Sequence, residues 1–132
     1  MSQHARGTFE VQLEREPPFD VGDGVSLGRT IVQKRFEGDL EGTSTVHMLA
    51  ALTPVQGSAG YVAIERVIGR LAGRSGTFVL QHFGVMTRGT QQLRVEVVPD
   101  SGSGALQGLH GQMTIEIPDG RHHYTFVYDF TP

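Results

Sequence analysis

Apolar and polar side chains alternate along most of this chain with a period of two residues. In the first such segment, Phe9, Val11 and Leu13 fall on one side, and Glu10 and Gln12 fall on the other. Successive side chains of a β-strand point to opposite faces, so this alternation predicts a strand with one buried face. We expect eight strands, at Arg6–Glu14, Leu27–Phe36, Leu40–Leu52, Ala59–Leu71, Thr77–Thr87, Gln91–Val98, Ala105–Ile117 and Arg121–Phe130.

Turn-forming residues separate these segments at short intervals. Pro17 and Pro18 end the first segment, and the stretch Asp20–Gly24 is expected to form a loop. The stretch Val46–Leu52 would also fit one or two turns of helix, but the β-branched residues around its start favour a strand. Because no segment can form a crossover helix, each strand is expected to pair with the next one in antiparallel fashion.

Eight consecutive antiparallel strands joined by short turns form either an up-and-down barrel or a two-sheet sandwich. We favour the barrel, because glycines inside five of the strands help a small sheet to coil, and closure removes exposed strand edges. Residues 1–132 then form one all-β domain. A barrel of eight strands either fills its interior with side chains or holds one small ligand there.

The composition narrows the classes of function without selecting one. Eleven basic and fourteen acidic side chains give a net charge of −3 and form no basic stripe. Neither nucleic acid nor a membrane surface is therefore expected as a partner. The chain has no cysteine, which excludes disulfides, thiolate metal sites and cysteine nucleophiles. The first ten residues contain no apolar signal sequence, so we expect a cytoplasmic protein.

Four glycine-containing stretches carry a resemblance to a known family: Gly42–Thr45, Gly57–Gly69, Gly73–Gly84 and Val97–Leu109. In their order and spacing, within a match from about Gly7 to Asp129, they resemble a bacterial family of uncharacterised small proteins. The fold of that family is similar to the barrel of allene oxide cyclase. The resemblance implies an eight-stranded antiparallel barrel with a partly enclosed interior and no assigned reaction. It transfers no catalytic residue, because similarity of fold alone does not define function.

Glu65 is the most informative residue for chemistry. If Arg66 faces water, period two places Glu65 inside the barrel, on the same face as Tyr61, Ala63 and Val67. A carboxyl group there must be neutral, hydrogen-bonded or paired, because burial of a lone carboxylate is strongly unfavourable. We expect it to act as a general acid or base, or to anchor the polar group of a ligand. The alternatives are a reversed strand phase, which puts Glu65 on the surface, and a purely structural role.

Histidine and glutamine side chains are the expected polar partners of Glu65. On a regular strand Gln81 and His82 point to opposite faces, and hydrophobicity does not decide between them; we favour His82 inside. A neutral imidazole in that position can exchange protons with a substrate or with Glu65. The alternative is a purely structural role, in which His82 is a hydrogen-bonded histidine in a packed sheet. His47 is a further candidate for ligand binding.

Aromatic side chains are expected to line the interior as well. The hydroxyls of Tyr61 and Tyr128 are predicted to orient a carbonyl or alkoxide group of a substrate. Tyr124 and Phe126, which share the alternation of the last strand, are predicted to contact a ligand. The alternative is that these residues only fill the core.

The histidines show no spacing that is typical of a metal site. The sequence contains neither His-x-His nor His-Glu-x-x-His. A site assembled across strands from His47, His82 and His110 is geometrically feasible, but nothing in the sequence supports it. We therefore expect neither a metal nor an organic cofactor.

These residues favour a small barrel that binds one compact, largely apolar molecule in its interior. On that molecule it would catalyse a cofactor-independent proton transfer, isomerisation or cyclisation, with Glu65 as the acid or base. One alternative is a carrier or sensor that binds the same molecule without chemistry. Another is a barrel with a solid interior whose apolar strands serve self-association.

A homo-oligomer, most simply a dimer, is expected from the outer faces of the strands. Val62, Ile64 and Ile68 lie opposite the face that carries Tyr61 and Ala63. One wall of the barrel would therefore expose branched apolar side chains. Exposed apolar patches of more than a few hundred Å² usually mark an interface.

Overall fold

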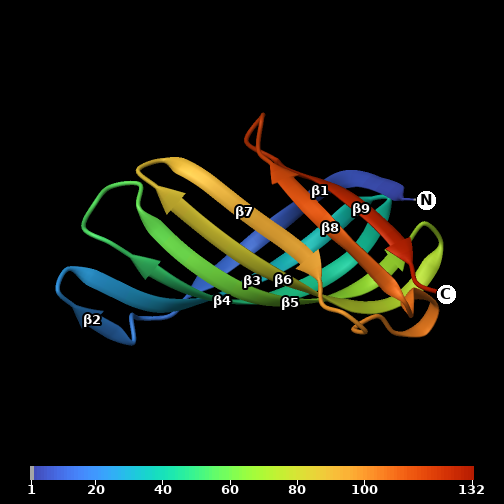
Figure 1. Cartoon of the computed structure of the whole chain (residues 1–132), viewed down its shortest axis with the longest axis horizontal. Helices are drawn as coiled ribbons and strands as arrows, with labels where there is room; N and C mark the ends of the chain where they lie inside the picture. The colour runs from blue at the N-terminus through green and yellow to red at the C-terminus, as the bar shows by residue number, and fades with distance from the viewer. Residues whose placement is uncertain (1) are drawn as a thin grey trace.

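The computed structural model describes residues 2–132 and consists almost entirely of β-strands (Figure 1). The elements are β1 (Gln3–Arg15), β2 (Asp20–Gly22), β3 (Val25–Gly38), β4 (Leu40–Leu52), β5 (Ala59–Leu71), β6 (Arg74–Thr87), β7 (Thr90–Val97), η1 (Gly104–Leu106), β8 (Leu109–Glu116) and β9 (His122–Phe130). η1 is a single turn of 3₁₀-helix, and the described residues contain no α-helix. The all-β fold class predicted from the alternation is confirmed.

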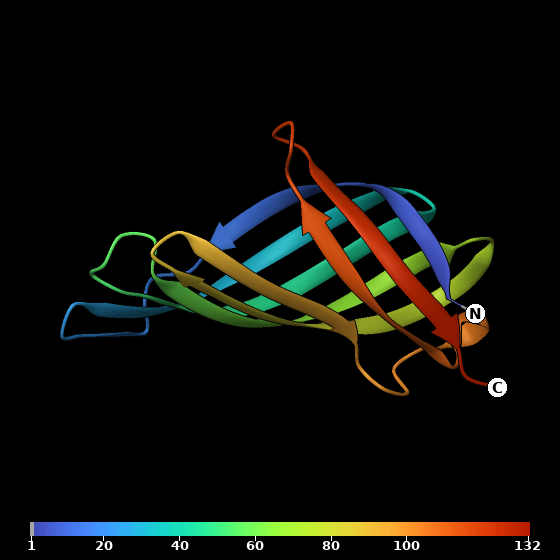
Figure 2. The same ribbon diagram turned by 45° about the horizontal axis from the view of Figure 1, so that its top comes forward.

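Eight of the nine strands close into one antiparallel barrel. They pair in the order β1-β9-β8-β7-β6-β5-β4-β3, and β1 also pairs with β3, so the sheet joins back on itself. Figure 2 shows the blue strand β1 passing between β9 and β3 at this closure. β2 lies outside the ring and pairs only with the start of β3. The predicted eight-stranded barrel is confirmed, with one extra strand.

Most strand boundaries follow the alternation. β4 and β5 begin and end where they were predicted, and Val46–Leu52 is strand throughout. The prediction of a loop at Asp20–Gly24 is wrong in part, because β2 pairs with residues Val25–Leu27. All three residues of β2 are exposed, so this strand has no buried face and leaves no hydrophobic pattern in the sequence.

The predicted strand Ala105–Ile117 starts too early. β8 begins at Leu109, because η1 occupies the preceding residues and Gly108 has a positive φ of 86°. A backbone with such a φ favours glycine and interrupts a regular strand. Leu106 in η1 is fully buried and belongs to the packed core, so this turn covers one end of the barrel.

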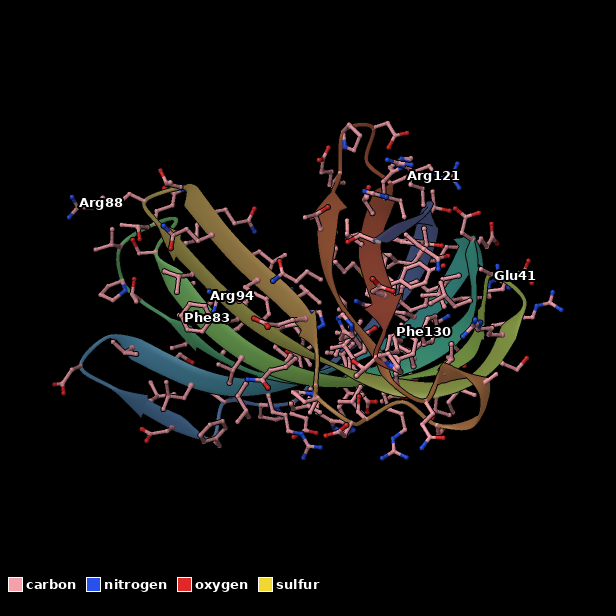
Figure 3. All side chains as sticks on the ribbon, turned by 45° about the vertical axis from the view of Figure 1, so that its right-hand side comes forward. Glu41, Phe83, Arg88, Arg94, Arg121 and Phe130 are labelled. Carbon is pink, nitrogen blue, oxygen red and sulfur yellow. The ribbon has the colours of Figure 1, made fainter. Side chains whose placement is uncertain are left out.

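One seam of the barrel is much shorter than the others. β4 and β5 pair along their full length, whereas β7 and β8 are joined only at Val95–Met113 and Glu96–Gln112. Beyond these residues the two strands diverge, and Figure 3 shows them as the sides of a wide V. The ring of strands is therefore closed at one end and opens along a mouth between β7 and β8 at the other.

Apolar side chains fill the closed end. Phe78 and Phe126 stack with ring centroids 5.9 Å apart, and Phe36 meets Tyr124 edge-on at 5.7 Å. We call the following buried residues the packed core: Ala5, Phe9, Phe36, Leu40, Val67, Leu71, Phe78, Leu80, Val95, Val97, Leu106, Leu109, Met113, Tyr124, Phe126 and Tyr128. Removal of this much apolar surface from water is the main term that stabilises the barrel.

Candidate functional site

Glu65 lies inside the barrel, as predicted. Its side chain has no exposed surface, while Arg66 next to it points outward. Glu65 is on β5, whose residues Ala63 and Val67 are also buried on the same face. It therefore lies between the packed core, which contains Val67, and the smaller cluster of Val32, Val46 and Ala63 beside the open end.

Three side chains from neighbouring strands bind the Glu65 carboxylate. The hydroxyl of Ser44 on β4 donates to Oε2 at 2.6 Å. The ammonium of Lys34 on β3 donates to Oε1 at 3.2 Å, and Nε2 of His82 on β6 lies 2.7 Å from the same oxygen. We call these four residues the polar cluster. All four are buried, and Lys34 is the most exposed at 8%.

Strand register explains how the polar cluster forms. Lys34 and Ser44 are directly opposite each other on β3 and β4. Glu65 pairs with Val46 on one side and with Leu80 on the other, which places Ser44 and His82 two residues away on the same inner face. Side chains that are diagonal across neighbouring strands remain within reach of one another.

The polar cluster keeps Glu65 ionised. Burial alone would raise the pKa of its carboxyl, but the hydrogen bonds from His82 and Ser44 and the positive charges of Lys34 and of His82 in its protonated form outweigh burial. Together they lower the pKa from 4.5 to about 2. An ionised carboxylate only accepts hydrogen bonds, so Nε2 of His82 must carry the hydrogen that lies between them.

The second ring nitrogen of His82, Nδ1, is left without a hydrogen-bond partner in the described residues. In the neutral ring a hydrogen on Nε2 leaves a lone pair on Nδ1. Nδ1 makes no hydrogen bond within the described residues, and there every fully buried side-chain nitrogen or oxygen has a partner. Nδ1 must therefore be accessible to solvent, and His82 lines the interior cleft described next.

A cleft of about 710 Å³ occupies the open end of the barrel. Its polar lining includes Lys34, Tyr61, His82 and His122. Its apolar lining consists of Phe9, Val11, Leu13, Val32, Val46, Met48, Leu93, Ile115, Ile117 and Pro118, and Gln91 and Glu116 complete it. The cleft thus has mainly apolar walls and a small number of polar groups, as ligand sites in proteins usually do.

Lys34 presents unused donors to this cleft. Its ammonium makes one hydrogen bond, to Glu65, and lies 4.4 Å from the ring centroid of Phe9 and 5.8 Å from that of Phe36. An ammonium has three donors, so some of them remain available to a ligand. Sequence reasoning missed Lys34 and Ser44, although Lys34 shares the period-two face of Val32 and Phe36.

Tyr61 and His122 are two further polar groups of the cleft, besides Gln91 and Glu116. Burial and the charge of Glu65 raise the pKa of Tyr61, so its hydroxyl keeps its hydrogen. The Tyr61 ring lies over Gly84, where a Cβ atom would collide with it. His122 stacks on Phe9 at 4.9 Å, and burial together with the charge of Lys34 lowers its pKa. The sequence analysis did not single out His122.

Three predicted aromatic residues face inward but belong to the packed core. The Tyr124 hydroxyl accepts a hydrogen bond from the backbone N–H of Leu40 at 2.9 Å, and the Tyr128 hydroxyl donates to Gln3 at 3.3 Å. Phe126 is fully buried and stacks on Tyr128 at 5.3 Å. The structure does not bring any of the three to the cleft. The alternation predicted correctly that they face inward, but it does not specify how deep in the barrel a side chain lies.

His47 and Gln81 lie on the outer surface. His47 Nδ1 is 2.9 Å from the Arg29 guanidinium, and both His47 and Gln81 are exposed. They line a hollow of about 580 Å³ on the outer wall together with Leu49, Val62 and Ile64. The structure therefore brings His82, and not Gln81, to Glu65.

His47, His82 and His110 do not converge, because His82 is inside while the other two are exposed. Within residues 2–132 no group of three or more histidine, aspartate or glutamate side chains could hold a metal ion. In the same part of the chain, no helix is long and apolar enough to cross a membrane.

The fold and the site define an antiparallel β-barrel protein with a buried ionic cluster at an interior cleft. Comparison with known families shows that the chain belongs to the DUF3224 family, described as "Protein of unknown function", which it matches over residues 5–128. The predicted resemblance to a bacterial family of uncharacterised small proteins is thereby confirmed. The likeness to allene oxide cyclase stays a prediction.

A solved structure supports this assignment. The chain is similar to a DUF3224 protein of unknown function from Shewanella oneidensis MR-1, with 50% sequence identity and a TM-score of 0.95. The match covers 100% of both chains. No curated protein is significantly similar to this chain.

Proposed function

We propose that this barrel binds a compact, largely apolar molecule in its cleft, with the polar end of that molecule against Lys34 and His82. The observation that carries the proposal is the unused hydrogen-bonding capacity of these two side chains at an otherwise apolar cleft. Apolar walls supply affinity through burial, and a few polar groups orient the ligand.

The buried ionic pair itself favours a binding role. Lys34 and Glu65 are joined at 3.2 Å with almost no exposed surface. A buried ion pair is often no more stabilising than apolar residues of the same volume would be. The cost of removing the two charges from water offsets the attraction between them. A buried ion pair that apolar residues could replace without loss of stability, and that adjoins a cleft, is better explained by a task in that cleft.

The same arrangement supports cofactor-independent proton transfer, as in an isomerase or cyclase. The sequence favoured Glu65 as the acid or base, but Glu65 has no exposed surface and both of its oxygens are bonded. These contacts favour His82 as the group that exchanges the proton, with Glu65 as the residue that positions it.

Fluorescence titration with 8-anilinonaphthalene-1-sulfonate, an aromatic body with one anionic group, tests the binding proposal. Lys34→Met should weaken binding at least about tenfold, which corresponds to loss of one hydrogen bond to a charged group. Arg35→Met is the matched control, because it removes a neighbouring charge on the exposed side of the same strand. Equal affinity for all three proteins would contradict the proposal.

The outer wall requires a second control, because it too is apolar. Val62→Thr changes that wall without touching the cleft lining, since Val62 is half exposed and faces away from the cleft. Val62→Thr should leave the affinity for the probe unchanged. Loss of probe binding in Val62→Thr, with retention in Lys34→Met, would move the binding site to the outer wall and overturn the proposal.

We also propose that two copies of the chain associate through this outer wall. Leu49, Val62 and Phe83 form a continuous row across β4, β5 and β6, because the register places them directly opposite one another. With Ile64 they make up the outer patch, and each of its four side chains is about half exposed.

The total exposed surface favours a second copy as the occupant of the outer patch. A folded monomer of this mass exposes about 6,800 Å², whereas this chain exposes 8268 Å². The excess is larger than the roughly 800 Å² that each partner buries in a standard interface. A patch on a regular sheet can also match itself about a twofold axis, as homodimers require.

A further inference from the structure

We propose that the ligand is an enolisable carbonyl compound, and that His82 removes a proton from the carbon beside its carbonyl group while Lys34 stabilises the resulting enolate oxygen. This inference rests on the proposed function, since it assigns a chemical class and a reaction to the occupant of the cleft. It goes beyond binding because it requires the two polar side chains to act on neighbouring atoms of one molecule.

The geometry brings a base and a cation together. Lys34 Nζ and His82 Nε2 both lie within hydrogen-bond distance of the same oxygen, Glu65 Oε1. Lys34 offers only donors, whereas Nδ1 of neutral His82 offers only an acceptor. A carbonyl with an adjacent C–H presents the complementary pair, because its oxygen accepts from Lys34 while its acidic C–H faces the base.

This complementarity separates carbonyl compounds from simple carboxylates. A carboxylate, like a sulfonate, would satisfy Lys34, but it offers no comparably acidic C–H to the lone pair on Nδ1 of His82. Tyr61 strengthens the preference, because its hydroxyl has no hydrogen-bond partner within the described residues and the residue lines the same cleft. It provides a second donor for the oxygen on which negative charge develops.

In the proposed step, Nδ1 of His82 takes the proton of the C–H bond. The electron pair of that bond forms a carbon–carbon double bond, and the carbonyl π pair moves to oxygen, where Lys34 and Tyr61 stabilise it. His82 is then an imidazolium, and the Glu65 carboxylate stabilises its charge through the existing 2.7 Å hydrogen bond. The imidazolium then exchanges this proton with solvent. Delivery of a solvent hydrogen to the same carbon completes the exchange, and delivery of a hydrogen to a conjugated carbon isomerises the molecule.

Glu65 is a positioning residue in this step, since the ligand cannot reach it. It fixes the tautomer of His82 by accepting from Nε2, and it holds Lys34 on the same side. Ser44 bonds the remaining carboxylate oxygen and so completes the anchoring of Glu65. The apolar walls lower the effective dielectric constant around the cleft, which strengthens the interaction of Lys34 with an enolate.

Exchange of hydrogen for deuterium in 1-phenylpropan-2-one tests the proposal. In D₂O, proton NMR follows loss of the CH₂ signal between its ring and its carbonyl. The wild-type protein should accelerate exchange over buffer, and His82→Gln should reduce that acceleration about 100-fold or more, the usual contribution of a general base. His110→Gln, which changes an exposed histidine on β8, should exchange like the wild type. Equal rates for His82→Gln and wild type would overturn the proposal.

Binding and exchange are measured separately so that the two proposals fail separately. Saturation-transfer NMR reports binding of the ketone, and the sulfonate probe reports occupancy of the cleft. If the probe binds in the cleft but the ketone neither binds nor exchanges, the carbonyl class is wrong while the binding function stands. If the ketone binds without exchange above buffer, the reaction is wrong and the barrel is a carrier.

The tautomer of His82 gives a test that needs no variant. Nitrogen-15 NMR of the wild-type imidazole ring distinguishes a hydrogen on Nε2 from one on Nδ1. In the neutral ring we expect the hydrogen on Nε2, and Glu65→Gln should loosen this preference. A hydrogen on Nδ1 in the wild type would overturn the assignment of His82 as base, whatever the variants do.

Discussion

The two ends of this barrel are built from the same eight strands but have different chemistry. At the closed end the interior is apolar. The hydroxyls of Tyr124 and Tyr128, which belong to this packed core, each form a hydrogen bond within the protein. At the open end Lys34, Tyr61 and His82 keep hydrogen-bonding capacity that the described residues do not use. The closed end therefore holds the fold together, while the open end is equipped for a ligand.

The short β7–β8 seam produces this difference. Where the two strands pair, Val95 and Met113 are buried, whereas Leu93 near the mouth is 37% exposed. A barrel of eight strands that closed along its whole length would leave an interior that side chains fill or that is just wide enough for one small ligand. Here the strands separate, so the side chains above the polar cluster line a cleft instead of meeting one another.

The largest expected effect is a difference in the free energy of unfolding that substitutions at the two ends of the barrel cost. Phe126→Ala removes a fully buried ring from the packed core and should lower the free energy of unfolding by up to about 5 kcal/mol. Met48→Ala at the half-buried cleft wall should lower it by only about 1 kcal/mol. Urea unfolding followed by circular dichroism measures both, and equal losses would contradict the division of the barrel into a packed and an open end.

The polar cluster should respond next most strongly to loss of one partner. Glu65→Ala leaves the buried ammonium of Lys34 without its carboxylate and should lower the free energy of unfolding by about 4 kcal/mol. The double variant Lys34→Met/Glu65→Gln removes both charges and should recover most of that loss. Urea unfolding of the two variants measures the difference, and a double variant that is no more stable than Glu65→Ala would show that the buried charges are not coupled.

Acid should destabilise the barrel through the same carboxylate. The pKa of Glu65 is lowered from 4.5 to about 2 in the folded chain, so its contribution is present above pH 4.5 and is lost as the pH falls towards 2. The expected loss is on the order of 3 kcal/mol. Comparison with Glu65→Gln isolates it, because exposed carboxylates such as Asp119 titrate in both proteins. Parallel stability curves for the two proteins between pH 5 and 2 would contradict this role.

The smallest expected effect concerns the outer patch. Light scattering should give a mass near twice 14.4 kDa at high protein concentration. Val62→Thr keeps the shape of the side chain but buries a hydroxyl, and should weaken association about tenfold. Val21→Thr, on the exposed strand β2 outside the outer patch, should not. A monomer at all concentrations would exclude a second copy as the occupant of the patch.

The sequence predicted which face of a strand a side chain occupies better than how deep in the barrel that side chain lies. The expected outward position of Arg66 was enough to place Glu65 inside. The alternation predicted the strands, while the closed sheet was predicted from the glycines inside the strands and from the removal of exposed edges. It did not separate Tyr61 at the cleft from Tyr128 in the packed core, because both occupy inward positions. Whether an inward side chain lies in the packed core or at the cleft depends on how far the neighbouring strands pair. The short pairing of β7 with β8 has no signal in the hydrophobic pattern.

The partners of Glu65 were only partly accessible from sequence. His82 was favoured as the inward neighbour, but Lys34 was passed over because a charged residue is usually read as exposed. Its inward phase is visible once Val32 and Phe36 are assigned to the core. Predicting the contact also requires the register that sets Lys34 opposite Ser44, and a strand pattern of period two does not specify register across strands.

The division between the two ends is tested most directly by the methionine methyl groups. Met48 lines the cleft and Met113 lies in the packed core, so selective carbon-13 labelling of the four methionine methyls includes one signal from the cleft and one from the packed core. On titration with 8-anilinonaphthalene-1-sulfonate, the Met48 signal should move and saturate while the Met113 signal stays in place. Saturable binding of the probe that leaves the Met48 signal unmoved would contradict the cleft as the ligand site.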